Sequence, residues 1–495
     1  MAPTRPKHTL VSVPDELLTL ILLELQLCDL LSIRRVCRHL NAISSGASVW
    51  RRLFEQSLGV TIPRPFFLPK TLKSASSRDI EGFLRKWHQY WRPVHPVQFF
   101  KRPIRCADLP EPITPNDTSI ITPGGRWIIS GYRDGSVWYI DLGHDPTSTT
   151  ALEPQLLVPA SLPDDTDDIQ IKIALDFSSG ESLGQSVDHH TLRQFNVAVV
   201  TSSSYDDPLP LNIDVWRVHV CTELGDPASL TLGPRLSNFT EEGDVALVSV
   251  GLHGRSVAYS ILLDHTKCVV VVDWMEADGK GKDEQFTRWY LPLSRANSIH
   301  LLPEDQILTT DNSDNAALFN WRKDCPSSTL RPSEQDLDHV SPFYHRAMDQ
   351  LIYFDAISPP TILRCCVQVV IPADEEAIRV DIPLGPDADT DSIRTISILK
   401  HPPYELAGRL RVFGHRRAIG LSGDYVLTVI HYSPEDGTGG NGSPTRVQSF
   451  EFPELTKLEN PPDRLLYDEF SQRIVLIDAD VSYVLTVDTS SIAEQ

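Results

Sequence analysis

Helical periodicity is confined to about the first fifth of this 495-residue chain. Before residue 97, leucines and other apolar residues recur three and four positions apart, which indicates helices. From residue 97 to residue 495, short β-rich runs alternate with clusters of Gly, Pro, Asp, Asn and Ser, which is typical of all-β domains. The sequence therefore predicts an α+β multidomain protein, with a small helical region followed by a large all-β domain.

The helical region is richest in leucine between Val13 and Phe54. Pro14 can open a first helix, because the N–H that proline lacks would have no partner there. Asp29 is positioned to cap a second helix, and a third helix is expected from Val36 to Ile43. The first helix is apolar around much of its circumference, and such a helix needs cover on all sides.

The order of these residues resembles the F-box, over residues 10–56. The shared pattern is Pro-x-Glu-Leu-Leu, Ile-Leu, a polar break, Asp-Leu-Leu, Val-Cys and a closing Val-Trp. The resemblance implies a three-helix unit that binds a small Skp-type adaptor, which in turn binds a cullin. The alternative is a helical cap that packs only on the rest of this chain. The residues expected to face the adaptor, or in part to form the three-helix core, are Pro14, Leu17, Ile21, Leu22, Leu25, Leu30, Leu31, Val36, Cys37, Leu40 and Trp50.

A linker is expected on the C-terminal side of the F-box, and a polar tail over residues 1–9 precedes it. The linker spans residues 57–96 and contains prolines at positions 63, 65 and 69. Within it, apolar residues at spacings of three and four predict an amphipathic helix over residues 78–91. We expect this helix to pack between the F-box and the next domain and to fix the angle between them.

The clearest β unit is the segment Arg126 to Leu142, in which two strands flank Asp134-Gly135. An Asp-Gly pair between alternating apolar residues is a strong hairpin signal. The segment resembles a WD-repeat blade, with Ile140-Asp141 where that family usually has Trp-Asp. Weaker relatives recur, and the runs Cys268–Trp274 and Gln306–Trp321 end in Asp-Trp and Asn-Trp.

About seven β units of this kind, 40 to 80 residues apart, fill residues 97–495. This spacing is near that of propeller blades with loop insertions. The sequence predicts a WD-repeat-like β-propeller of about seven blades, whose radial repetition leaves only short protected strand edges. The Gly-His pair and the regular period of typical WD repeats are missing, so a pair of β-sandwiches is the alternative.

Charge is divided unevenly along the chain. Residues 1–105 contain 17 Lys or Arg and 7 Asp or Glu, a balance of +10, while the remainder contains 28 and 59, a balance of −31. Because nucleic-acid binding needs a basic surface, the acidic β domain argues against nucleic acid as the main ligand. The acidic surface suits a protein client that is basic, or serves only to keep the chain soluble.

No motif for catalysis, a cofactor or a metal ion is recognised. The glycines at 437–442 do not lie between a strand and a helix, so a phosphate-binding loop is not expected. Asp387, Asp389 and Asp391 imitate the start of a calcium loop, but Ser392 and Ile398 stand where that loop needs Gly and Glu. The eight cysteines are scattered, which is typical of reduced thiols in an intracellular protein.

These observations predict a non-enzymatic protein of the cytoplasm or the nucleus that binds no membrane. By its resemblance, the chain would be the substrate receptor of a Skp–cullin–F-box ubiquitin ligase, binding the adaptor through the F-box and a client through the β domain. Two alternatives stay open. One is an F-box scaffold that acts outside ubiquitin transfer, and the other is a propeller enzyme with an appended F-box, whose active site would be assembled from distant loops.

Overall fold

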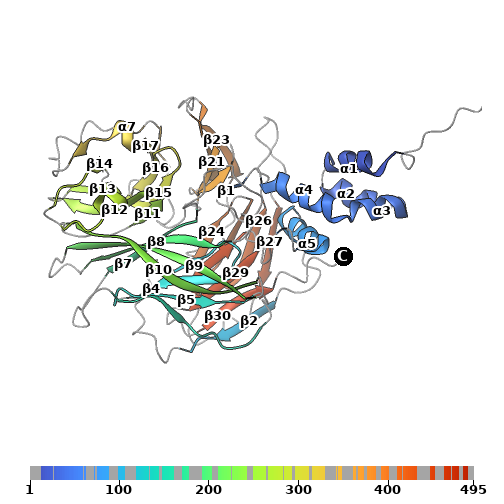
Figure 1. Ribbon diagram of the computed structural model, residues 1–495, viewed down its shortest axis with the longest axis horizontal. Helices are drawn as coiled ribbons and strands as arrows, with labels where there is room; N and C mark the ends of the chain where they lie inside the picture. The colour runs from blue at the N-terminus through green and yellow to red at the C-terminus, as the bar shows by residue number, and fades with distance from the viewer. Residues whose placement is uncertain are drawn as a thin grey trace, which may run out of the picture.

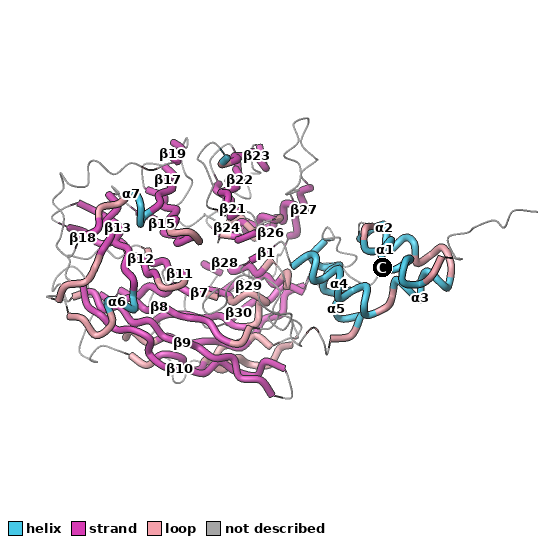
Figure 2. The backbone as a smooth tube through the Cα atoms, turned by 45° about the horizontal axis from the view of Figure 1, so that its top comes forward, coloured by secondary structure: helices cyan, strands magenta, loops and turns pink. Residues whose placement is uncertain are grey.

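The computed structural model comprises a small group of helices beside a larger body of strands (Figure 1). A view turned by 45° separates the N-terminal helices from the strands along the long axis of the molecule (Figure 2). No helix among the described residues is long and apolar enough to cross a membrane. The structure describes residues 13–25, 27–58, 61–62, 72, 75–88, 98–105, 119–132, 134–143, 148–160, 170–177, 192–202, 210–223, 226–241, 249–263, 266–281, 284–292, 296–311, 315–328, 342, 344–347, 360–363, 366–372, 376–385, 392–400, 410–414, 416–431, 446–451, 462–469, 471–478 and 483–488.

Four helices form the F-box region where the sequence predicted three. Pro14 occupies the N-cap position of the first helix, as its place in the sequence indicated. The second helix begins two residues before Asp29, so that Asp29 lies in the first turn and does not cap the helix. The closing Val-Trp pair lies on a helix of its own. The helices are α1 (Asp15–Leu23), α2 (Leu27–Ile33), α3 (Arg38–Ser44) and α4 (Ala47–Leu58).

The helix predicted over residues 78–91 is α5 (Ser77–His88), and it joins the core of the F-box helices. Ser76 caps it, because its hydroxyl accepts a hydrogen bond from the N–H of Asp79 at 3.1 Å. Ile80 and Leu84 are buried in one cluster with residues of α1, α2 and α4. We call α1 to α5 the helical unit. The last predicted position of this helix, Trp91, lies outside the described residues.

Seven antiparallel sheets build the β domain among the described residues, as in a seven-bladed propeller. In six blades the strands follow chain order from the first strand outward, and in blade 7 a strand from the start of the domain completes the sheet. The first strands of neighbouring blades contact each other, for example β7 with β11 and β11 with β15, which places them on the inside of the ring. The strands of blades 1 to 3 are β3 (Ser119–Ile121), β4 (Trp127–Gly131), β5 (Val137–Asp141) and β6 (Gln155–Val158); β7 (Gln170–Asp176), β8 (Gln194–Ser202), β9 (Leu211–Glu223) and β10 (Asp226–Glu241); and β11 (Val250–His253), β12 (Ser256–Leu263), β13 (Thr266–Asp273) and β14 (Arg288–Pro292), extended by β18 (Ser327–Ser328).

The remaining four blades complete the ring. Blade 5 contains a fifth strand, β1 (Thr61–Ile62), which comes from the segment between α4 and α5 and pairs with the first strand of that blade. The helical unit therefore meets the propeller at the inner edge of blade 5. The strands of blades 4 to 7 are β15 (Ala296–Leu302), β16 (Gln306–Asp311), β17 (Asn315–Asn320) and β19 (Tyr344–Ala347); β20 (Thr361–Leu363), β21 (Cys366–Pro372), β22 (Glu376–Pro383) and β23 (Arg394–Lys400); β24 (Leu410–Phe413), β25 (Arg417–Leu421), β26 (Val426–His431) and β27 (Arg446–Glu451); and β28 (Pro462–Asp468), β29 (Arg473–Asp478), β30 (Tyr483–Asp488) and β2 (Gln98–Pro103).

The ring closes through β2, which pairs with β30 although nearly the whole domain separates them in sequence. The side chain of Arg102 is 7% exposed and donates hydrogen bonds to the carbonyl oxygens of Leu142 at 2.7 Å and Thr150 at 2.9 Å. Both carbonyls belong to the connection between β5 and β6 of blade 1. One strand therefore completes blade 7 as its terminal strand, and its Arg102 side chain bonds to blade 1, so that β2 joins the two ends of the ring.

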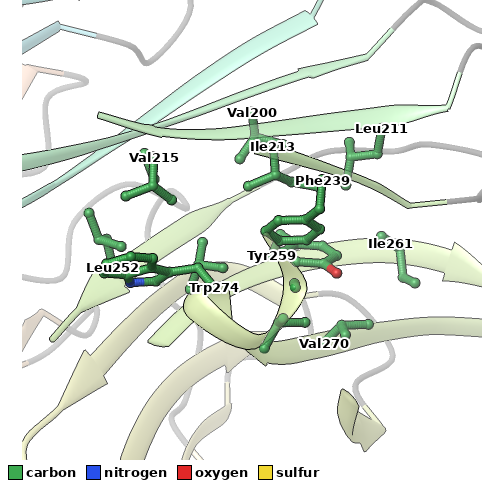
Figure 3. Close-up of a cluster of buried hydrophobic side chains, with 14 of the residues drawn as sticks. Val200, Leu211, Ile213, Val215, Phe239, Leu252, Tyr259, Ile261, Val270 and Trp274 are labelled. Carbon is green, nitrogen blue, oxygen red and sulfur yellow. The ribbon is translucent and has the colours of Figure 1, made fainter. Parts of the chain in front are cut away.

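Apolar side chains fill the spaces between blades. The largest cluster joins blades 2 and 3, where Val200, Ile213 and Phe239 face Tyr259 and Val270 (Figure 3). Each of these five side chains is at most 1% exposed. Apolar residues on both faces of the middle strands follow from this arrangement, because each blade is covered by a neighbour on either side.

The hairpin predicted at Asp134-Gly135 joins β4 to β5. Gly135 has a φ of 80°, and the carboxylate of Asp134 accepts a hydrogen bond from the N–H of Ser136 at 2.9 Å. The Asp-Trp and Asn-Trp pairs lie where β13 and β17 end, with Asp273 and Asn320 as the last strand residues and the tryptophans just beyond them. Each then starts a one-turn helix, α6 (Trp274–Ala277) or α7 (Trp321–Asp324), which the preceding Asp273 or Asn320 side chain caps.

Candidate partner-binding site

Helix α1 has an apolar side that faces solvent. Leu17, Leu20 and Ile21 are 51%, 47% and 45% exposed. Their spacing of three and four residues places them on one side of the helix. The opposite side packs in the core of the helical unit through the buried residues Leu18, Leu22 and Leu23.

A fourth exposed apolar residue, Val36, lies in the turn between α2 and α3 and is 70% exposed. Three residues further on, His39 Nε2 lies 3.2 Å from Asp15 Oδ1, which joins the start of α3 to the start of α1. We call Leu17, Leu20, Ile21 and Val36 the exposed apolar set.

The four residues of the exposed apolar set are close together in the sequence, unlike the other exposed hydrophobic residues. Seven large hydrophobic residues are exposed in the described part of the chain, and four of them fall between residues 17 and 36. The other three, Leu156, Met275 and Val447, lie on or beside blades 1, 3 and 6. Single exposed apolar residues are common on proteins, whereas a group of them is typical of a surface that binds a partner.

The eleven residues predicted to face the adaptor, or in part to form the core, divide by burial. Pro14, Leu17, Ile21 and Val36 are exposed, and Leu25, Leu31 and Cys37 are partly buried. Leu22, Leu30, Leu40 and Trp50 are each at most 2% exposed and lie in the helical unit, so that they support the fold in the free chain. A role in partner binding stays a prediction for all eleven.

Leu20 was not among the predicted site residues, although it lies between Leu17 and Ile21 on the exposed side of α1. Leucines surround α1 on several faces, so the pattern does not say which of them the core leaves uncovered. The exposed side becomes identifiable only when the positions of α3 and α4, which pack against α1, are known.

A buried group of charged and aromatic side chains joins blades 2 and 3 of the propeller. Glu241 of β10 accepts hydrogen bonds from Arg288 Nε at 2.8 Å and from the Tyr259 hydroxyl at 2.9 Å. All three side chains are at most 5% exposed, and the Arg288 guanidinium lies 3.5 Å from the centre of the Phe286 ring. Burial, with the adjacent Glu241 charge, raises the pKa of Tyr259 well above its usual value. This group fastens blade 2 to blade 3.

No group of three or more side chains suited to hold a metal ion occurs among the described residues. Asp387, Asp389 and Asp391, the acidic triplet that imitates a calcium loop, lie outside the described part, as do the glycines at 437–442. His300 of β15 is partly buried, and its removal from water lowers its pKa to about 4. The lowered pKa favours the neutral imidazole, which suits a side chain that is packed in the fold.

Comparison with known proteins identifies the N-terminal helices. Residues 10–56 match the family model of F-box-like domains, which are the bounds predicted from the sequence. No curated protein sequence matches the chain.

Two solved structures are similar to this chain. The β-propeller domain of Cps50 (Swd1) from Myceliophteria thermophila aligns with a TM-score of 0.43 at 13% identity, covering 75% of this chain and 96% of that one. A chain of the mitotic checkpoint complex aligns with a TM-score of 0.39 at 7% identity, covering 81% of this chain and 95% of that one. The protein thus contains an F-box-like domain followed by a seven-bladed propeller.

Proposed function

We propose that this chain, with its F-box-like domain at residues 10–56 and its seven-bladed propeller, is the substrate-recognition subunit of a Skp–cullin–F-box ubiquitin ligase. The F-box-like domain binds a Skp-type adaptor, and the adaptor connects the chain to a cullin. The propeller binds a protein client. The chain itself catalyses no step.

The observation that supports adaptor binding most directly is the exposed apolar set on the F-box-like domain. A helical unit of this size buries only a modest core, and its exposed leucines remain in water unless a partner covers them. The fully buried core of a protein interface is more apolar than the rest of the protein surface. The match of residues 10–56 to the F-box-like family model supports this proposal, because the exposed apolar set lies within the matched segment.

The role of the propeller is the presentation of a client. Holding a client lysine near a ubiquitin-loaded enzyme raises its effective concentration, and this needs no reactive group in this chain. The acidic charge of the β domain favours a client with a basic surface. Function in the cytoplasm or the nucleus, where ubiquitin ligases of this type act, is part of the proposal.

The test uses a double variant, Leu17→Asp with Ile21→Asp, in the full chain. Both side chains are about half exposed, so the carboxylates remain solvated and the helical unit stays folded. In a complex they would be buried without a partner, which costs several kcal/mol per charge. We expect capture of the adaptor to fall by at least about 100-fold, since each 1.4 kcal/mol is a factor of ten.

Leu156→Asp is the matched control, because Leu156 is also 51% exposed but lies on β6 of the propeller. This variant should capture the adaptor like the unmodified chain. Equal capture by the double variant would refute binding through α1. Adaptor binding without a co-purifying cullin would instead favour the scaffold alternative, and clients whose lifetimes lengthen on removal of this chain would favour the ligase.

A further inference from the structure

The turn that presents Val36 also contains Arg34, whose side chain points the other way, into the helical unit. The turn is closed by hydrogen bonds from the N–H of Arg35 to the carbonyl of Ser32 and from the N–H of Val36 to the carbonyl of Ile33, both 3.1 Å long. Arg34 therefore lies in the same three-residue turn as the most exposed residue of the exposed apolar set.

Arg34 makes three contacts with three different parts of the helical unit. Its Nη2 donates a hydrogen bond to the carbonyl of Ser44, at the end of α3, at 2.9 Å. Its guanidinium carbon lies 4.9 Å from the centre of the Trp50 ring, on α4. Its Nη1 lies 2.7 Å from Glu81 Oε1, on α5. A planar guanidinium can satisfy several partners at once, because its donors point outward in a fixed fork.

The contact with Glu81 is shielded from solvent. The Arg34 and Glu81 side chains are 14% and 15% exposed, which sets this pair apart from an ordinary surface salt bridge. Glu81 also contacts Arg85, one turn further along α5, at 2.9 Å. Arg85 is 30% exposed and has no contact with the turn in the described structure, so that it serves as an internal control.

Helix α5 lies outside residues 10–56, yet it packs as part of the same body. Phe83 contacts Phe54 of α4 with ring centres 5.8 Å apart. Ile80 and Leu84 are at most 1% exposed in the shared core. The Arg34–Glu81 pair adds a polar contact between this helix and the turn that presents Val36.

We infer that Arg34 is a positioning residue that couples the docking of α5 to the shape of the turn presenting Val36. The adaptor as the partner of this turn rests on the proposed function, whereas the coupling itself does not. When α5 is docked, Glu81 holds Arg34 and so holds the turn in its binding shape. By linkage, adaptor binding must in return strengthen the docking of α5. The helix that leads into the propeller therefore regulates the adaptor site.

The experiment compares three variants of the full chain. Glu81→Ala removes the acceptor for Arg34, Glu81→Gln retains a neutral acceptor of the same length, and Arg85→Gln removes only the second partner of Glu81. The first measurement is hydrogen exchange of the Arg35 and Val36 amides in the free chain. We expect Glu81→Ala to speed this exchange by about fivefold or more, as is typical of a coupling free energy between sites. Glu81→Gln should give an intermediate rate and Arg85→Gln the original one.

The second measurement is the affinity for the Skp-type adaptor, determined by calorimetry. Glu81→Ala should weaken binding by about fivefold or more, and the same change in an Arg34→Met background should have little further effect. If Glu81 only stabilised the fold, Glu81→Ala would lower the thermal midpoint, but its effect on adaptor affinity would be the same with and without Arg34→Met. Unchanged exchange at the turn in Glu81→Ala overturns the inference, even if the adaptor does not bind at all. Failure of the original chain to bind the adaptor contradicts the proposed function instead.

Discussion

The helical unit and the propeller solve the problem of apolar surface in opposite ways. Within residues 17–36 the helical unit leaves four large hydrophobic residues exposed, whereas the described part of the propeller leaves three that are far apart. Each blade is covered by two neighbours, and β2 closes the ring because it completes blade 7 by pairing with β30 and bonds to blade 1 through Arg102. The helical unit has no such closure. This contrast separates a propeller whose blades cover one another from a helical unit with an exposed apolar surface, which we propose a partner covers.

The two regions also differ in where they place charge. The Glu241–Arg288 pair of the propeller is 4% and 5% exposed, and the Arg34–Glu81 pair of the helical unit is 14% and 15% exposed. A fully buried pair fixes one packing of two blades and is costly to disrupt. The partly exposed pair lies beside a surface that we propose to be functional, where a weaker contact can respond to binding.

The strongest test that the helical unit and the propeller fold independently is Trp50→Ala. Trp50 is fully buried in the helical unit, and the loss of a buried tryptophan costs about 3–5 kcal/mol. A helical unit of this size has little more stability than that to lose. We expect the helical unit to unfold while the propeller remains folded. Among the described elements, the main contact between the two regions is that of α4 with the short strand β1. Hydrogen exchange should show lost protection in α1 to α5 and unchanged protection in β8 and β13. Loss of protection in both regions would show that they fold as one.

A second, smaller effect is expected in the propeller from Arg288→Met. The substitution leaves the Glu241 carboxylate buried with the Tyr259 hydroxyl as its remaining hydrogen-bond donor among those described. Breaking a buried ion pair from one side costs about 3 kcal/mol or more. Urea denaturation should show this loss in the transition of the propeller, while adaptor binding stays unchanged. The double variant Glu241→Met with Arg288→Met should recover part of the stability, since no unpaired charge remains. A further loss in the double variant would contradict this account.

Local patterns allowed much of the architecture to be predicted. The apolar period that changes at residue 97 predicted the two regions, and Asp134-Gly135 predicted a hairpin because its geometry depends on two adjacent residues. The F-box-like domain and a propeller of about seven blades were predicted correctly for the same reason. Each blade repeats a short local signal, so the fold can be recognised even though the typical WD-repeat residues are largely missing.

Contacts between distant residues could not be predicted in this way. The pairing of β2 with β30 closes the ring, but neither strand contains a residue that specifies the other. Arg34 and Glu81 are 47 residues apart, and the sequence contains many other charged residues of both signs. The exposure of Leu20 depends on which faces of α1 the other helices cover. Local periodicity therefore defines the elements, and long-range packing decides which residues remain available to a partner.

The smallest expected effect is a pH dependence of stability that is confined to the propeller. It arises from Asp468, at the junction of blades 7 and 1. Its side chain is 6% exposed, and burial raises its pKa to about 6 from 3.8, although the Ser471 N–H donates a 2.8 Å hydrogen bond to it. A raised pKa means that the neutral form is favoured in the folded state. Its contribution to stability is therefore present below pH 3.8 and is lost as the pH rises through about 6.

Asp468→Asn removes this titration, so the comparison isolates the carboxyl group from all others. As the pH rises from about 4.5 to 7.5, the unmodified chain should lose about 2 kcal/mol of propeller stability relative to the variant, at 1.36 kcal/mol per pKa unit. Urea denaturation across this pH range provides the measurement. The helical unit contains no part of this junction, so exchange in α1 to α5 should not distinguish the two proteins at any pH. If both proteins show the same pH profile, the carboxyl group is ionised in the folded state as readily as in the unfolded chain, and the junction stabilises its charge.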